Sequence, residues 1–99
     1  MTTPLSIDAT ETPAGGAGLR VVGEIDLSNV DAFVAALDDL AADHQGTLAL
    51  DFRAVNYLDS AAINALFGKS DRITITANPV LMAALTVSGL ADLVPVDTD

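Results

Sequence analysis

The chain has 99 residues, of which 51% are hydrophobic and 4% aromatic, and its 14 acidic residues outnumber its 4 basic ones to give a formal net charge of -10. This length fits a single domain over residues 1–99. The negative charge would repel nucleic acid and anionic membranes, so we expect no nucleic acid and no membrane as partner, but a protein with a basic face. The chain has no cysteine, which excludes disulfides and thiolate chemistry, and no run of about 18 apolar residues, so we expect a soluble, cytoplasmic protein.

Alternating apolar residues open the chain and predict a hairpin. Leu5, Ile7 and Ala9 alternate with polar residues, and a second apolar stretch begins at Leu19 after the glycine- and proline-rich segment TETPAGGAG. This pattern predicts two antiparallel strands. Because the glycines join two strands rather than a strand and a helix, we do not interpret them as a phosphate-binding loop.

Helical spacing begins at Ser28. Ser28 is the predicted N-cap, and Asp31 three residues later completes a capping box. The helix should end near Asp43, before Gly46. Its predicted apolar face, with Phe33 turned toward the core, consists of Val30, Phe33, Val34, Leu37, Leu40 and Ala41.

The segment TLALDF then predicts a central strand, because consecutive Leu48, Ala49 and Leu50 suggest that both of its faces are covered. A short helix should follow over Ser60–Phe67, in SAAINALF, and the segment RITITA, residues 72–77, predicts the next strand.

The last third of the chain predicts one helix and one strand. In NPVLMAALTVSGL, Asn78 is the expected N-cap, Pro79 the first helical residue and Gly89 the residue just past the end, so that Leu90 packs back on the helix. A short strand over residues 93–96 should precede an acidic tail at about 97–99. The order β-β-α-β-α-β-α-β predicts an α/β fold: a mixed, mostly parallel sheet with an antiparallel N-terminal hairpin and helices packed against it.

No group of residues suggests catalysis. His44, the single histidine, lies in the polar connection ADHQG, which should open at the opposite edge of the sheet from Ser60. Asp39 and Asp43 share a helix face with His44 nearby, but such spacing is more typical of a solvated surface than of a metal site. We therefore expect no enzyme, no catalytic residue, no metal ligand and no cofactor.

Ser60 raises the main functional question, because it lies where a strand ends and a helix begins, in LDSAAINAL. Backbone N–H groups are unpaired at such a position, and the helix dipole is positive there. One interpretation is that Asp59 or Ser60 caps the helix, which would contribute about 1 kcal/mol. The other is that the Ser60 hydroxyl is placed for phosphorylation by another protein.

Three stretches resemble the STAS domain of bacterial anti-sigma factor antagonists. They are GEIDLSNVDAF from Gly23, LALDFRAVNYLDSAAINAL from Leu48 and SGLADLVPV from Ser88, which together span nearly the whole chain. In that family a Gly-Glu-Ile/Leu-Asp segment precedes the first helix, and the phosphorylated serine directly follows an aspartate. The resemblance therefore implies that Asp59 and Ser60 form the switch.

The same resemblance implies the partner-binding surface: Glu24, Asp26, Leu58, Asp59, Ser60, Ala61 and Ala62. Ala61 and Ala62 stand where the family has a second hydroxyl residue and a glycine. The segment between Ser60 and RITITA is shorter than the family pattern by about two helical turns, and the family's closing helix has no counterpart after the last strand.

Two functions follow from the resemblance. In the first, the chain binds an anti-sigma factor of the serine kinase type and is released when Ser60 is phosphorylated, which regulates sigma-factor-dependent transcription. In the second, the chain is a constitutive STAS interaction subunit, for example of a lipid-transport ATPase complex, and Ser60 is never modified. Ala61 and Ala62 slightly favour the second. Neither interpretation implies a particular oligomeric state.

Overall fold

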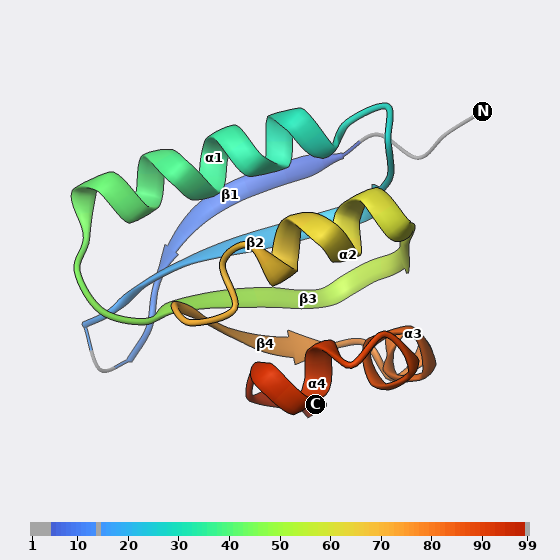
Figure 1. Cartoon of the computed structure of the whole chain (residues 1–99). Coiled ribbons are helices and arrows are strands. Elements are labelled where there is room, and N and C mark those ends of the chain that lie inside the picture. Colours follow the sequence, from blue (N-terminus) through green and yellow to red (C-terminus); the bar gives the residue numbers. More distant parts are fainter. Residues whose placement is uncertain (1–4, 14, 99) are drawn as a thin grey trace.

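A computed structural model describes residues 5–13 and 15–98, which form a five-stranded sheet with helices packed against it (Figure 1). The strands lie side by side in chain order: β1 (Ser6–Glu11), β2 (Ala17–Ile25), β3 (Leu48–Leu58), β4 (Ile73–Ala77) and β5 (Val96–Thr98). The helical segments are α1 (Val30–Asp43), α2 (Ser60–Phe67), the 3-10 turn η1 (Pro79–Leu81), α3 (Met82–Val87) and α4 (Leu90–Leu93).

The sheet is mixed, as the sequence predicts. Strands β1 and β2 pair antiparallel, whereas β2–β3, β3–β4 and β4–β5 are all parallel. Each parallel pair is joined through helical segments that return the chain to the same edge of the sheet. The predicted α/β fold with an N-terminal hairpin is confirmed.

Strand β3 departs from the prediction in two ways. It continues through Leu58, because Val55 and Leu58 are still directed into the core. Its second face is not covered, since Ala49 and Asp51 are only half-buried. The prediction of a doubly covered strand was wrong because a small residue such as alanine is tolerated on either face of a sheet.

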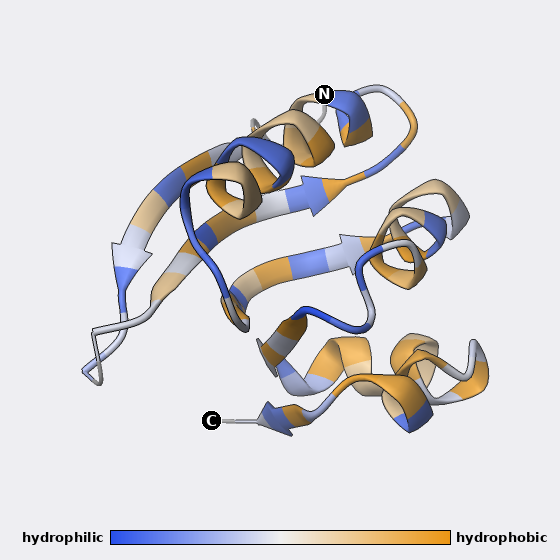
Figure 2. Ribbon diagram, turned by 60° about the vertical axis from the view of Figure 1, so that its left-hand side comes forward, coloured by the Kyte–Doolittle hydropathy of each residue, from blue (hydrophilic) through white to orange (hydrophobic). Residues whose placement is uncertain are grey.

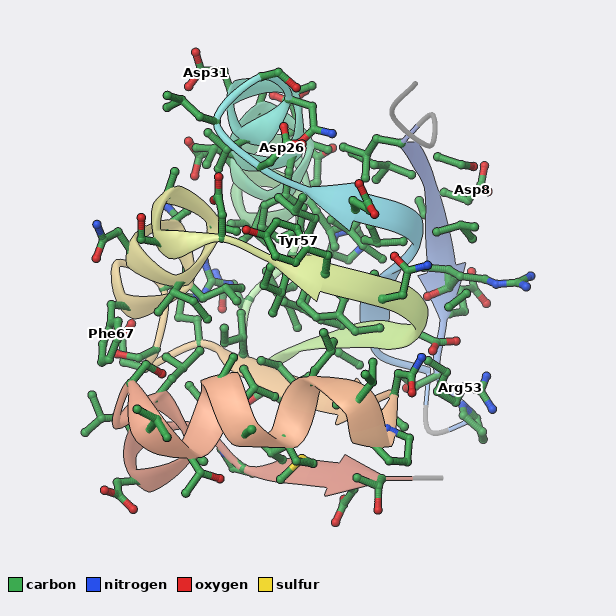
Figure 3. The ribbon with its side chains drawn as sticks, turned by 90° about the vertical axis from the view of Figure 1, so that its right-hand side faces the viewer. Asp8, Asp26, Asp31, Arg53, Tyr57 and Phe67 are labelled. Carbon is green, nitrogen blue, oxygen red and sulfur yellow. The ribbon has the colours of Figure 1, made fainter. Side chains whose placement is uncertain are left out.

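One face of the sheet carries the core. Helices α1 and α2 pack on that face (Figure 1), and Asp8 and Arg53 point away from the helices on the opposite face (Figure 3). Figure 2 shows hydrophobic and hydrophilic residues alternating along the strands, as a sheet with one solvated face requires. At the centre, the rings of Phe33 and Phe52 meet edge to face with centroids 5.9 Å apart, and both are fully buried.

The start of α1 differs from the predicted capping box. The N-cap is Asn29, and its side chain makes no cap hydrogen bond. Ser28 instead uses its hydroxyl to donate to Asp26 Oδ1, so it is not free to cap the helix. The box of Ser28 and Asp31 was wrong because the loop before the helix recruits the hydroxyl for its own turn. The helix does end at Asp43, as expected.

The C-terminal third is more broken than the sequence predicts. The expected single helix is divided into η1 and α3, and a further helix, α4, follows Gly89, whose φ of 85° lies in the left-handed region. Leu90 is fully buried, as predicted. Because α4 occupies residues 90–93, the last strand begins only at Val96; residues 97 and 98 belong to β5 rather than to a tail, and Asp99 lies outside the described residues.

Candidate functional site

The candidate site lies where β2 and β3 end together at one edge of the sheet. Ile25 pairs with Leu58, and the N–H of Asp59 donates to the carbonyl of Ile25 over 3.2 Å. Parallel pairing therefore brings the loop after β2 beside the turn that begins α2. Glu24 and Asp26, more than 30 positions from Ser60 in sequence, reach the same edge.

Asp59 joins these two segments through its carboxylate. Oδ1 accepts from the N–H of Ala62 over 3.0 Å, which makes Asp59 the N-cap of α2. Oδ2 accepts from the N–H of Leu27 over 2.9 Å, in the loop between β2 and α1. Of the two residues that the sequence offered as caps, Asp59 therefore caps the helix.

Ser60 is the first residue of α2 and is exposed. Its hydroxyl forms no hydrogen bond with any residue in the described ranges, 5–13 and 15–98. Since Asp59 supplies the cap, the hydroxyl has no structural role in the helix start. It is open to a second protein.

The loop between β2 and α1 is fixed by its own side chains. Asp26 Oδ1 accepts from both the N–H and the hydroxyl of Ser28. The carboxamide of Asn29 accepts from the N–H of Asp26 over 2.9 Å and donates to the carbonyl of Glu24 over 2.8 Å. Asn29 was missed from the sequence, although an asparagine between a strand and a helix is a typical turn residue.

Two of the predicted partner-binding residues are not at the surface. Leu58 is only 6% exposed and Ala62 is fully buried, so both belong to the core and cannot offer a partner the expected apolar contact. They were misplaced because strand alternation and helical rotation turn them inward. Glu24, Asp26, Asp59 and Ala61 are half-buried and Ser60 is exposed, and these five lie at the shared edge.

Exposed apolar residues complete this edge and were also missed. Leu27 follows Asp26 in the loop and is 77% exposed, and Tyr57 at the end of β3 is 49% exposed. Figure 3 shows Tyr57 below Asp26 on the side turned to the viewer. In the sequence, Leu27 falls at helical spacing with Val30 and Val34, so the pattern gave no sign that it would be exposed.

Arg53 pairs with a neighbouring carboxylate away from the candidate site. The Arg53 side chain hydrogen-bonds the Asp51 carboxylate on the open face of the sheet and lowers the pKa of Asp51 from its ordinary value.

His44 lies before β3, at the opposite end of that strand from Ser60. The described part of the chain contains no group of three or more His, Cys, Asp or Glu residues arranged to hold a metal ion, and none of its helices is both long and apolar enough to cross a membrane.

The comparisons with known proteins agree with this geometry. The family model described as "Mlab, STAS domain" matches residues 9–95. The chain is 35% identical over 74 residues to the anti-sigma-F factor antagonist RsfB of Mycobacterium tuberculosis, in strains CDC 1551 / Oshkosh and ATCC 25618 / H37Rv. The match covers 74% of this chain and 61% of RsfB, so the chain spans about three fifths of the length of these relatives.

Solved structures with the same fold come from the same class of protein. An anti-sigma factor antagonist from Mycobacterium paratuberculosis superposes with a TM-score of 0.84 at 23% identity and covers 98% of this chain and 90% of its own. The unphosphorylated form of the anti-sigma factor antagonist SpoIIAA gives a TM-score of 0.73 at 16% identity, with 95% and 90% covered. Similarity at these identities establishes the fold.

Proposed function

Because this chain belongs to the STAS domain family, whose model matches residues 9–95, we propose that it acts as an anti-sigma factor antagonist. It binds an anti-sigma factor of the serine kinase type, and phosphorylation of Ser60 releases it. The relative RsfB, named as an anti-sigma-F factor antagonist, supports this class of partner. The observation that carries the proposal is the exposed Ser60 hydroxyl, which directly follows the capping Asp59 and has no partner among the described residues.

The release step follows from charge and size. The kinase would transfer the terminal phosphoryl group of ATP to Ser60 Oγ, with loss of the hydroxyl proton and formation of ADP. The phosphate adds about -1.5 to -2 charge beside the carboxylates of Asp26 and Asp59. The N–H groups at the start of α2 tolerate this charge, but a partner surface fitted to a small hydroxyl does not. No refolding of the chain is required.

Variants of Ser60 test the proposal. Ser60→Asp and Ser60→Glu should weaken binding to the anti-sigma factor, because each adds a carboxylate at the contact. Ser60→Ala should bind like the wild type but should not be released by the kinase, because it has no acceptor oxygen. Mass spectrometry of protein isolated from its own cells should find phosphate on the peptide spanning residues 56–69. Equal affinity of all the variants, with no phosphate on that peptide, would contradict the switch.

A constitutive STAS subunit of a lipid-transport ATPase is the second candidate. It is favoured by Ala61, which stands where the resemblance places a second hydroxyl residue. In that case a tagged chain would recover a transport ATPase and no anti-sigma factor, and Ser60 would be unmodified in every growth condition.

A further inference from the structure

Two large apolar side chains are exposed beside the candidate site without serving the core. Leu27 is 77% exposed and Tyr57 is 49% exposed, although the remaining large apolar residues of β2 and β3 are buried or half-buried. Single exposed apolar residues are common on proteins. Here Leu27 lies in the loop after β2, bonded to Asp59, and Tyr57 lies near the end of the paired strand β3, so both are at the same edge of the sheet, where apolar surface gains free energy when it is covered. We call these two residues the Leu27–Tyr57 patch.

The patch is held in place before any partner arrives. The Leu27 N–H is bonded to Asp59 Oδ2, and the next N–H, that of Ser28, is bonded to Asp26 Oδ1. Tyr57 belongs to β3 and is in register with Glu24 of β2. Because neither segment must be ordered on binding, little of the contact energy is lost to conformational entropy.

Acidic groups surround the patch. Glu24 and Asp26 lie beside it on the β2 side, and Asp59 lies on the α2 side. The basic residues are placed elsewhere: Arg20 and Arg53 line a hollow on the open face of the sheet, Lys69 pairs with Asp38, and Arg72 donates to carbonyl groups of residues 41, 44 and 46. A complementary partner therefore has an apolar pocket with Arg or Lys side chains at its rim.

We propose that the Leu27–Tyr57 patch is the main anchor for the anti-sigma factor, and that it inserts into an apolar pocket with a basic rim. This inference rests on the proposed function and adds to it the residues that supply the affinity. Buried aromatic and aliphatic anchors with polar surroundings carry most of the energy in typical interfaces. Ser60 then controls binding, because a phosphate on its hydroxyl would lie at the water-excluded border of this contact and oppose docking.

Site-specific photo-crosslinking in the protein's own cells tests which surface is used. A benzophenone amino acid is introduced at position 27, at position 57, or at position 87 as the control, because Val87 is also apolar, is 88% exposed and lies on α3. We expect an anti-sigma factor, identified by mass spectrometry, to be cross-linked from positions 27 and 57 and not from 87. Cross-links from position 87 alone, or no cross-link at 27 and 57, would overturn the patch and leave the proposed function standing. Cross-linking of a transport ATPase in place of an anti-sigma factor would overturn both.

Affinity measurements with the purified anti-sigma factor that cross-linking identifies give the contribution of each residue to binding. Leu27→Ser and Tyr57→Thr should each raise Kd by about tenfold or more, the usual effect of losing an interface anchor, whereas Val87→Ser should change it less than about twofold. For Leu27→Ser and Tyr57→Thr, Kd should depend on salt concentration as it does for the wild type, whereas Asp26→Asn should weaken that dependence. Unfolding midpoints equal to that of the wild type show that the variants fold, and a Leu27→Ser variant that folds and binds normally would refute the anchor.

Discussion

Replacing Asp59 should separate its structural role from the proposed switch role of Ser60. The Asp59 carboxylate accepts two backbone N–H groups, one at the start of α2 and one in the loop before α1. Loss of an N-cap costs about 1 kcal/mol, and loss of an exposed hydrogen bond to a charged acceptor costs about 0.5 to 1 kcal/mol more. Asp59→Ala should therefore lower the free energy of unfolding by about 1.5 to 2 kcal/mol.

Two matched variants make this prediction specific. Asp59→Asn keeps one acceptor oxygen, which can cap α2, so it should lose only the bond to Leu27 and about 0.5 to 1 kcal/mol. Ser60→Ala removes a hydroxyl with no partner in the described residues, so its effect on stability should be within about 0.5 kcal/mol.

Urea unfolding followed by circular dichroism measures all three variants, with the slope m unchanged if only the native contacts differ. In a chain of this size, each 1 kcal/mol should lower Tm by about 4 to 8 °C. A stability of Asp59→Ala equal to that of the wild type, or a loss in Ser60→Ala as large as in Asp59→Ala, would show that the cap has been assigned to the wrong residue.

Three further predictions concern the scaffold. Phe33→Ala removes a fully buried ring that packs on Phe52 and should cost about 3 to 5 kcal/mol in urea unfolding; an unchanged midpoint would place the ring outside the core. Arg53 lowers the pKa of Asp51 by hydrogen bonding, so the carboxylate stabilises the fold above its unfolded pKa of about 4, and this contribution is lost as the pH falls below that value. The difference in free energy of unfolding between the wild type and Asp51→Asn should accordingly become smaller at acidic pH. A difference that grows at acidic pH would contradict a stabilising role of the Asp51 carboxylate. Gly18→Ala would place a Cβ 2.3 Å from a backbone carbonyl oxygen of β3 and should destabilise by about 1 to 3 kcal/mol, whereas normal stability would mean that the two strands can separate locally.

The sequence by itself determined the order of the elements from β1 to β4 and the position of the Asp59–Ser60 pair at a helix start. Alternation at the N-terminus, helical spacing after Ser28 and the turn at Gly89 are local signals, and each depends on residues only a few positions apart. The Asp59–Ser60 pair was recognisable for the same reason, since a strand end followed by a helix start is encoded within about ten residues.

Only the tertiary structure decided which side chains are available at the site. Leu58 and Ala62 are turned into the core, whereas Leu27 is exposed; periodicity assigns residues to a face, but only the packed structure shows which face is covered. The second hydrogen bond of the Asp59 carboxylate, from the N–H of Leu27 32 positions away, exists only because parallel pairing of β2 and β3 brings the two segments together. Long-range pairing thus fixed the surface of the site, because it sets both the register of the strands and the position of the loops at their ends.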